Sequence, residues 1–421
     1  MKILVRWMFR FLATVILRRY HPVVVAVAGS VGKTATKDAL VAGVQSSKRS
    51  VRGTVGNFNA EIGVPATVMS AGGSPTSIGG WVKLFLRGVQ QALLGRAYPS
   101  LLVLELAADH PGDLRPLLKM IQPTVGVLTS AAPEHLEYFG DEAGVIAEES
   151  LVVRLLPPTG TAVVNIDDPR IAAVLPSLTT KVITYGWSND AQVRADSMSI
   201  TKNAHGMPDG MVVKVAIDGS VVPVAIPGVI GRHQIYPILA AVAVGVALGD
   251  EVMSVVQQLS AYVPPPGRMR LFAGREGSLL IDDTYNASPE AVQAALQSLH
   301  ELEGPSQRIA ILGQMSELGA AAAEWHDRIG REVAQLRISE LVLVGPLAER
   351  IGRAAIAAGF SATNVHIVAT AEAAAATILP RLNPSMAVLL KGSRFASRLE
   401  RAVAILLDNP DRDTTFLVHG H

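Results

Sequence analysis

The sequence predicts an α/β protein with two mostly parallel sheets, and three features of the chain lead to this prediction. Apolar strand-like runs alternate with helical patterns from His21 to about Leu178, as a parallel sheet covered by helices requires. The same alternation resumes after Gly267 and predicts a second, doubly wound domain. Between the two, the run Pro264-Pro265-Pro266-Gly267 is the strongest linker signal. We expect an amphipathic helix at residues 1–21, a central domain at 22–262 and a C-terminal domain at 263–421.

The composition narrows the class of protein. The 421 residues include 37 basic and 36 acidic side chains, so the net charge of +1 favours neither a nucleic-acid-binding protein nor an acidic tail. With 49% hydrophobic and 17% charged residues, disorder is excluded for most of the chain. The absence of cysteine excludes disulfides, thiolate catalysis and cysteine-ligated metals. This composition fits a reducing compartment, and we expect a cytoplasmic protein.

The first twenty residues hold five basic side chains and no acid. Trp7, Phe11 and Val15 belong to an apolar stripe at helical spacing, with Arg6 and Arg10 on the adjacent face. These arginines interrupt the apolar run, which is too short to span a bilayer. A basic amphipathic helix can lie in the headgroup region of an anionic membrane, where each basic residue adds roughly 1 kcal/mol. It can equally dock on the protein body with its arginines solvated, and the sequence leaves both interpretations open.

Individual strands can be placed from their apolar runs and the turn residues around them. In the central domain they are expected at Val23–Ala28, Leu101–Leu106, Thr124–Thr129 and Thr161–Asn165. Residues 181–227 change to short alternating segments broken by Gly, Asp and Pro, which predicts an antiparallel patch, and a helix is expected at Gln234–Leu248. In the Rossmann-like C-terminal domain, strands are expected near Leu279–Asp282, Arg308–Leu312, Glu340–Val344, His366–Val368 and Ala387–Leu390.

A glycine-rich segment follows the first strand and opens a helix expected at Thr34–Gln45. Glycines let backbone N–H groups surround an anion, and the helix N-terminus adds partial positive charge. Lys33 can reach the β- and γ-phosphates of a nucleotide, and the Thr34 hydroxyl can ligate Mg²⁺. Val27 stands at the first glycine position of the full G-x-x-x-x-G-K-T pattern. We therefore predict a phosphate site, with a structural helix cap as the alternative, at Gly29, Ser30, Val31, Gly32, Lys33 and Thr34.

Eight strings in one order resemble the Mur ligase family, and within it the members that add D-alanyl-D-alanine to a UDP-muramoyl tripeptide. They are AGSVGKTATK (28–37), GNFNAEIGVP (56–65), LELAADHPGDL (104–114), EHLEYFG (134–140), GRMR (267–270), IDDTYNASPEA (281–291), LGQMSELG (312–319) and KGSR (391–394). The strings extend over about 95% of the chain. The resemblance implies a central P-loop-type ATPase domain and a Rossmann-like ligase domain, with ATP and Mg²⁺ as cofactors.

For the central domain, the resemblance implies that Glu105 and His135 hold magnesium together with Thr34, and that Lys33 and His135 are catalytic. Glu105 ends a strand at the carboxyl edge of the sheet, where ligands of open α/β sheets bind. Taken alone, Glu105 could be a solvated strand end and His135 an ordinary hydrogen-bonding histidine. The family's acyl substrate lies against the loop that carries Asn57 and Asn59, for which ordinary turn chemistry is the alternative.

For the C-terminal domain, the resemblance implies a nucleotide-facing segment and a cationic strand end. The nucleotide-facing residues are Arg268, Asp282, Asp283, Tyr285 and Asn286. Lys391 and Arg394 belong to the KGSR string, where cationic side chains could hold a carboxylate of the incoming substrate. Without the resemblance, both sets would be interpreted as solvated strand ends.

The chain departs from the family pattern in several places, including Asp109 where many members have Asn and Gln314 where an acid is usual, and three departures bear most on function. Family members carry a lysine, converted by CO₂ to a carbamate, where gapless alignment from His135 places Glu149. We expect the Glu149 carboxylate to replace that carbamate in metal binding and catalysis, with a surface acid as the alternative. Gln234 and Pro237 stand where the family has two asparagines, the second of which reads adenine, so adenine selectivity is in question. Only about 21 residues precede the first strand, whereas the D-alanyl-D-alanine-adding members normally carry an N-terminal UDP-binding domain.

The resemblance and the phosphate loop together predict an ATP-dependent amide ligase that works through an acyl phosphate. The leading amine is D-alanyl-D-alanine and the leading acid is a muramoyl tripeptide, in peptidoglycan precursor synthesis. A poly-γ-glutamate-type synthase is one alternative, and a catalytically weakened nucleotide-binding scaffold at the membrane is another. We expect small-molecule substrates, no nucleic-acid partner, a monomer, and peripheral membrane contact through residues 1–20 on the cytoplasmic face.

Overall fold

The computed structural model describes residues 2–46, 49–56, 58–70, 75, 77–95, 97–131 and 136–418, with residues 2–4, 136 and 137 described by their backbone alone. Two compact units make up the fold. The first comprises residues 1–197, 213–224 and 235–263, and the second comprises residues 198–212, 225–234 and 264–421. The main part of the second unit therefore begins at the proline run, but two shorter pieces of the preceding sequence also belong to it.

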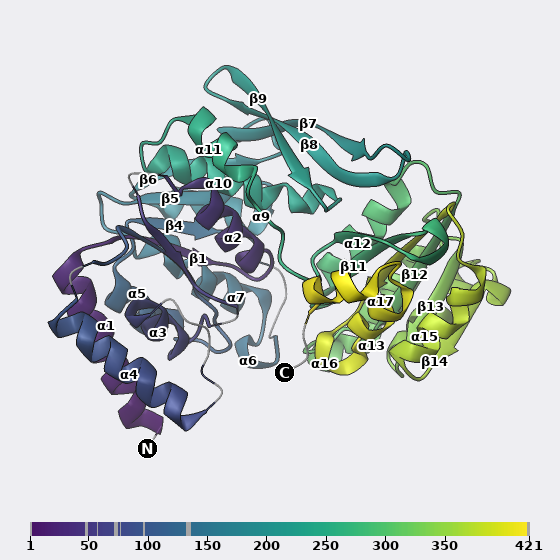
Figure 1. Cartoon of the computed structure of the whole chain (residues 1–421), viewed down its shortest axis with the longest axis horizontal. Helices are drawn as coiled ribbons and strands as arrows, with labels where there is room; N and C mark the ends of the chain where they lie inside the picture. Colours follow the sequence, from purple (N-terminus) through teal and green to yellow (C-terminus); the bar gives the residue numbers. More distant parts are fainter. Residues whose placement is uncertain are drawn as a thin grey trace. The chain divides into compact units, whose positions relative to one another are not determined.

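A nine-stranded sheet, in the order β2-β3-β1-β4-β5-β6-β7-β8-β9, is the frame of the first unit (Figure 1). The pairings from β2 through β7 are parallel. Its strands are β1 (Val23–Ala28), β2 (Val51–Gly53), β3 (Leu101–Glu105), β4 (Val125–Leu128), β5 (Thr161–Asn165), β6 (Lys181–Gly186), β7 (Val193–Lys202), β8 (Pro208–Ile217) and β9 (Ser220–Pro227). The expected α/β class and parallel central sheet are confirmed.

The central strands are apolar throughout because both faces of the sheet are covered. In β1, Val24 and Ala26 point into the core on one face of the sheet. Val25 and Val27 are equally buried and point to the other face of the sheet. This alternation leaves the polar residues to the strand ends. The carboxyl ends of β1, β3 and β4 consequently meet at one edge, where the loop after each strand is free to carry chemistry.

The segment expected to be antiparallel, residues 181–227, is antiparallel only in its later part. Its first strand, β6, pairs in parallel with β5 and so extends the parallel sheet. The strands β7, β8 and β9 follow as neighbours joined by short turns, which only antiparallel strands can use. The two-residue turn Asp218-Gly219 has positive φ at both positions, 46° and 76°, as a type I′ hairpin requires.

Helices cover both faces of the first sheet. Helices α2, α10 and α11 contact one another, and α1 contacts α3, α4 and α5. The helices of this part of the chain are α1 (Lys2–Tyr20), α2 (Lys33–Gly43), α3 (Gly63–Met69), α4 (Ile78–Leu93), α5 (Leu114–Ile121), α6 (Leu136–Phe139), α7 (Glu142–Glu149), α8 (Leu151–Arg154), α9 (Pro169–Ala172), α10 (Tyr236–Ala247) and α11 (Val252–Leu259).

The N-terminal helix α1 docks on the first unit, which is one of the two interpretations that the sequence left open. Ala13 and Ile16 are completely buried, and Phe9 packs against two aromatic rings of α4. Arg19 donates hydrogen bonds to the carbonyls of Ala92 and Leu93 at the C-terminus of α4, at 2.7 and 2.8 Å. A basic side chain at that end stabilises the helix dipole and satisfies its last carbonyls.

Docking divides the predicted apolar stripe of α1 into an inner and an outer part. Leu12, Val15 and Ile16 face the core, whereas Trp7 and Phe11 are 63% and 55% exposed. The arginines are not all simply solvated, because Arg6 also forms an ion pair with Glu61. Within the described residues, none of the helices combines the length and the apolar character that crossing a membrane demands.

The second unit contains a six-stranded sheet in the order β10-β11-β15-β12-β13-β14, parallel except for the antiparallel edge strand β10. Its two faces form separate cores, because Ile281 and Leu389 lie in one and Leu280 and Val388 in the other. This confirms the expected doubly wound domain. Its strands are β10 (Arg270–Ala273), β11 (Leu279–Asp283), β12 (Gln307–Gly313), β13 (Glu340–Val344), β14 (Val365–Val368) and β15 (Met386–Lys391).

Helices of the second unit lie on both faces of this sheet (Figure 1). They are α12 (Pro289–Glu301), α13 (Ala322–Val333), α14 (Ala348–Ala357), α15 (Ala371–Ile378), α16 (Arg394–Ser397), α17 (Glu400–Leu406) and α18 (Pro410–Asp413). Side chains of α12, α13 and α14 fill one core, and those of α15 and α17 fill the other.

Candidate active site

The phosphate loop runs from the end of β1 to the start of α2. Gly29 has φ 130°, and a Cβ there would lie 2.3 Å from Thr129 Oγ1, so glycine is required. Gly32 is the left-handed N-cap residue of α2, with φ 87° and no side-chain cap. The first turn of α2 therefore keeps N–H groups for an anion, which favours the predicted phosphate site over a structural helix cap.

The departure from the full phosphate-loop pattern has a structural reason. Val27, which stands in place of the first glycine, is still within β1, where it pairs with Glu105 of β3 and Val127 of β4. The loop proper begins only at Gly29. Ser130, in the segment after β4, holds it by accepting a hydrogen bond from Val31 N on its Oγ at 2.8 Å.

Lys33 folds back over this loop. Its Nζ donates hydrogen bonds to the carbonyls of Gly29 and Ser30 at 2.5 and 2.9 Å. The ammonium group is thereby held above the backbone that would surround a phosphate. A cation in this position can neutralise charge on a bound polyphosphate.

Thr34 and Glu105 meet beside the loop, as expected for a metal site. Glu105 is 1% exposed, and its Oε1 accepts hydrogen bonds from Thr34 Oγ1 at 3.1 Å and from Asn59 Nδ2 at 2.9 Å. Among the described residues, the buried Oε2 has no hydrogen-bond partner. An unsatisfied buried carboxylate oxygen next to a hydroxyl suits a hard divalent cation, so the residues present fit Mg²⁺.

Two of the predicted residues in this region, Asn57 and His135, lie outside the described residues. The described ranges alone contain no group of three or more His, Asp or Glu side chains arranged to hold a metal ion. Asn59, expected near the acyl substrate, donates a hydrogen bond to the Glu105 carboxylate in this structure.

The adjacent acids Glu148 and Glu149, at the end of α7, have different surroundings. Glu148 accepts hydrogen bonds from Gly112 N at 2.9 Å and Leu114 N at 2.8 Å, and so caps the start of α5. Glu149 is 4% exposed, and its Oε2 accepts a hydrogen bond from Gly29 N at 2.7 Å. Glu149 is therefore not a surface acid, because its carboxylate contacts the phosphate loop itself.

In the second unit, the ends of β11 and β15 form a buried charged cluster. Asp283 pairs in register with Lys391, whose Nζ donates hydrogen bonds to Asp283 Oδ2 at 2.6 Å and to the Asn286 carbonyl at 2.9 Å. Burial lowers the pKa of Lys391, and the adjacent Asp283 carboxylate opposes that shift. Lys391 is 1% exposed and its charge is paired with that of Asp283, so these strand ends are not solvated.

Three side chains stack beside this cluster. Arg268 lies 4.4 Å and Arg394 lies 5.7 Å from the centre of the Tyr285 ring. The next residue, Phe395, is 85% exposed. Two guanidinium groups around one aromatic ring form a local positive site that can contact phosphate or carboxylate.

Two further titratable groups lie in this part of the second unit, the buried Asp282 and the partly buried His233. Burial raises the pKa of Asp282 to about 6, against hydrogen bonds from Thr284 that lower it. Burial also lowers the pKa of His233 to about 4, while the nearby Asp283 raises it. His233 is consequently neutral at pH 7. Pro237 lies in the first turn of α10, where proline is tolerated, as its position in the motif predicted.

Sequence reasoning assigned no role to Ser130, Glu148 or His233. Ser130 could have been found, because it follows the strand that neighbours β1 and polar residues at such strand ends converge. The role of Glu148 as a helix cap depends on packing of α7 against a distant loop and has no local signal.

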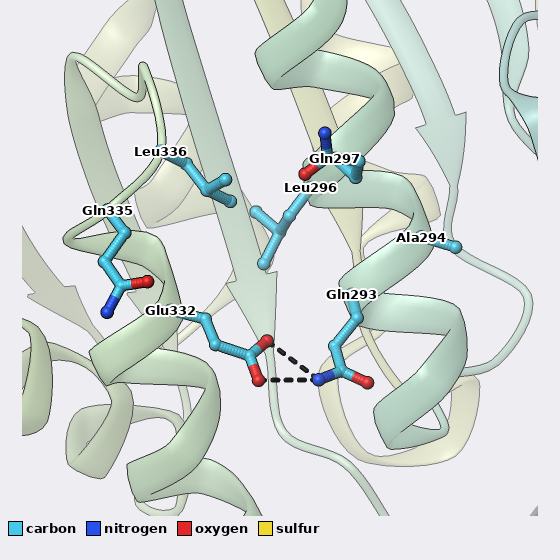
Figure 2. Close-up of a pocket in the computed structure, with 7 residues that line it drawn as sticks. All are labelled: Gln293, Ala294, Leu296, Gln297, Glu332, Gln335 and Leu336. Atoms are coloured by element: carbon cyan, nitrogen blue, oxygen red, sulfur yellow. Dashed lines mark hydrogen bonds between the residues drawn. The ribbon is translucent and has the colours of Figure 1, made fainter.

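A groove of about 420 Å³ between α12 and α13 is a separate feature of the second unit (Figure 2). Glu332 and Gln293 face each other across it, and Gln293 Nε2 donates hydrogen bonds to both Glu332 oxygens at 2.6 and 2.8 Å. It contains none of the predicted site residues. Its lining offers no cation to a phosphate, so we do not assign the chemistry to it.

The phosphate loop on a parallel sheet, together with a second doubly wound unit, is typical of α/β enzymes that bind nucleotides. Two family models match the chain: the Mur ligase middle domain over residues 87–245 and the Mur ligase, glutamate ligase domain over residues 267–394. The chain is 31% identical over 411 residues to UDP-N-acetylmuramoyl-tripeptide–D-alanyl-D-alanine ligase of Mycobacterium tuberculosis, covering 92% of this chain and 73% of that protein. The chain belongs to the Mur ligase family, whose members are ATP-dependent ligases that form C–N bonds.

Solved structures agree with this membership. MurF from Acinetobacter baumannii superimposes with a TM-score of 0.78 at 26% identity, covering 96% of this chain and 81% of that one. MurF from Thermotoga maritima in complex with ADP gives a TM-score of 0.78 at 26% identity, covering 95% and 83%. The α/β architecture expected from the sequence is thus the architecture of these ligases.

Proposed function

We propose that this protein is an ATP-dependent ligase that joins D-alanyl-D-alanine to a UDP-muramoyl-tripeptide-type acid in peptidoglycan precursor synthesis. Similarity to D-alanyl-D-alanine-adding ligases along most of the chain supports the substrate class. The observation that carries the chemistry is the hydrogen bond from Thr34 to the buried Glu105 beside the phosphate loop, with one carboxylate oxygen left unsatisfied among the described residues. A leader at residues 1–21, an ATP-binding domain at 22–262 and a ligase domain at 263–421 complete the proposal.

In the proposed reaction, an oxygen of the substrate carboxylate attacks the γ-phosphorus of ATP and ADP leaves. The amine nitrogen of the second substrate then attacks the acyl carbon, phosphate leaves, and the nitrogen loses a proton as the amide forms. Lys33 and the N–H groups at Gly32 and in the first turn of α2 stabilise charge on the transferring phosphoryl group. The protein therefore contributes position and electrostatics rather than a covalent step.

Thr34 and Glu105 would hold Mg²⁺, and His135 is the third residue that we propose for the metal. Bound Mg²⁺ supplies a Lewis acid that neutralises the phosphate oxygens. Asn59 positions the carboxylate of Glu105 by donating a hydrogen bond to Oε1, and Oε2 is left without a hydrogen-bond partner among the described residues. Asn57 and Asn59 are also proposed to face the acyl substrate.

Glu149 is proposed to act where other family members use a carbamylated lysine. Its carboxylate is buried within hydrogen-bonding distance of the phosphate loop, where an ATP phosphate would place further negative charge. Two anions in one buried site need a cation between them. A glutamate here therefore supplies a permanent carboxylate, and we expect activity that does not depend on CO₂.

The Glu149 proposal is tested by assaying phosphate release in CO₂-depleted buffer. Wild type should keep its rate, and Glu149→Ala should lose at least about 100-fold, the effect of removing one strong charge-stabilising group. Glu148→Gln is the matched control: it disturbs the cap of α5 but leaves the phosphate loop, so its rate should stay within a few-fold. Full activity of Glu149→Ala, or a wild-type enzyme that requires added bicarbonate, would contradict the proposal.

In the second unit, we propose that Arg268, Asp282, Asp283, Tyr285 and Asn286 form the nucleotide-facing surface. Arg394, stacked on Tyr285, is proposed to bind the carboxylate of the incoming amine substrate. Lys391 was expected to share that task, but its buried ion pair with Asp283 favours a positioning role for the loop that carries Asn286.

Partners and location complete the proposal. The enzyme acts on small molecules as a cytoplasmic monomer, and residues 1–20 make a peripheral membrane contact. Since Ala13 and Ile16 are part of the core, that contact involves only the outer face of α1, which carries Trp7 and Phe11. Point substitutions on this face are a better test than deletion of the helix, which would expose the core.

The proposed activity is tested by a phosphate-release screen. UDP-muramoyl tripeptide with D-alanyl-D-alanine should give turnover that needs both substrates, and glutamate with a glutamyl acid should not. Turnover with the glutamate pair alone would favour a poly-γ-glutamate-type synthase. Intact ATP binding without turnover by any pair would favour the scaffold alternative.

A further inference from the structure

Helix α4 presents an exposed apolar strip. Its residues Ile78, Val82, Leu86 and Leu93, spaced by four, four and seven positions, lie on one face and are 52–85% exposed. The opposite face, with Leu84 and others, is buried on the body of the protein. Large apolar side chains gathered on one exposed face of a helix mark an interaction surface rather than ordinary scatter.

The charged residues of α4 itself are all basic. Lys83 and Arg87 are exposed beside it, and among the described residues neither forms an ion pair. Helices α1 and α4 together contain seven basic residues and no acid, whereas the rest of the chain has 30 basic and 36 acidic residues. The positive charge of the protein is thus concentrated on these two helices.

Helix α1, in contact with α4, carries a second exposed apolar face. It lies beside α4, with Phe9 against Trp81 at a ring-centre distance of 5.9 Å (Figure 1). On its outer face, Trp7 stacks on Phe11 at 5.6 Å, and the exposed Arg18 follows seven residues after Phe11 on the same side. Both helices bury their inner sides in one core, so their outer sides are both left to solvent.

We propose that α4, together with the outer face of α1, is a binding surface for an anionic lipid bilayer. Apolar side chains and a tryptophan would enter the interface while Lys83, Arg87 and Arg18 contact lipid phosphates, the arrangement typical of helices lying in the membrane plane. A second copy of the chain fits less well, because a symmetric contact would oppose like charges. This inference extends the contact proposed for residues 1–20 and does not depend on the ligase reaction.

Vesicle sedimentation with the full-length protein tests the surface. Wild type should bind phosphatidylglycerol vesicles, bind phosphatidylcholine vesicles much more weakly, and lose affinity in high salt. Neutralising both α4 cations with Lys83→Gln and Arg87→Gln should lower partitioning about 30-fold, which is about 2 kcal/mol at roughly 1 kcal/mol per basic residue. Val82→Asp with Leu86→Asp should abolish binding.

Two controls establish that vesicle binding depends on this surface in particular. Met253→Asp places a charge on a similarly exposed apolar residue of α11 and should leave vesicle binding unchanged. Turnover of soluble substrates and the melting temperature should be unchanged in the Val82→Asp, Leu86→Asp variant, because both side chains are exposed.

Three results would overturn the inference. One is the absence of binding to anionic vesicles. Another is binding that Trp7→Ser with Phe11→Ser removes but the α4 substitutions leave intact, which would confine the contact to residues 1–20. The third is a wild-type dimer that the α4 substitutions convert to monomer without any vesicle binding, which would make a second copy the partner.

Discussion

The buried ion pair between Lys391 and Asp283 gives the sharpest stability prediction. Lys391→Met removes the charge and keeps most of the side-chain volume. Within the part of the chain that the structure describes, it leaves the buried Asp283 carboxylate with a single long hydrogen bond, from Met269 N at 3.3 Å. Breaking a buried pair from one side costs about 3–5 kcal/mol. In a unit of this size, that lowers the melting temperature on the order of 10 °C.

Differential scanning calorimetry of the second unit's transition within the full chain is the appropriate assay. The double variant Asp283→Asn, Lys391→Met removes both charges and should recover most of the loss, because no uncompensated charge remains. If Lys391→Met melts within about 2 °C of wild type while the KM for the amine substrate rises tenfold or more, Lys391 binds substrate, and the positioning role is wrong.

Three further predictions probe other parts of the fold. Gly29→Ala should weaken ADP binding at least tenfold in calorimetric titration, since its Cβ collides with Thr129 and its φ is 130°; unchanged affinity would contradict the loop geometry. Burial raises the pKa of Asp282 in the folded protein to about 6, against an ordinary 3.8. The protonated carboxyl therefore stabilises the folded state below pH 4, and this stabilisation, about 3 kcal/mol, is lost as the pH rises from 4 to 6. In urea titrations, the stability of Asp282→Asn relative to wild type should therefore rise by that order between pH 4 and 7, and a constant difference would exclude the shift. Ile16→Ala should cost about 2–5 kcal/mol of unfolding free energy, and Arg18→Gln on the outer face about 0.5 or less; equal effects would show that α1 is not part of the core.

Much of the fold could be predicted because buried parallel strands have a strong local signal. The strands β1, β5 and β13 have the expected bounds, since each is a short apolar run with turn or helix residues on both sides. The antiparallel edge strand β10 was not predicted. Its four residues carry no strand signal of their own, and they form a strand by pairing with β11. The interleaving of residues 198–212 and 225–234 with the second unit also has no local signal.

The candidate site was predictable where its residues are close in sequence. Gly29 to Thr34 form one continuous segment, the loop and the first two residues of α2, and their spacing alone defined it. The surroundings of Glu149 and Lys391 were not predictable, because they depend on partners 120 and 108 residues away. Helix packing brings Glu149 to Gly29, and sheet register brings Lys391 to Asp283. The same is true of α4, whose apolar strip looks like core until its buried side is known.

The central claim, ligation through an acyl phosphate, is tested most directly by isotope transfer. UDP-muramoyl tripeptide labelled with ¹⁸O in its reacting carboxylate is incubated with ATP and D-alanyl-D-alanine, and the released phosphate is analysed by mass spectrometry. The proposed mechanism predicts one ¹⁸O atom in each phosphate released. Product formation with unlabelled phosphate would contradict it.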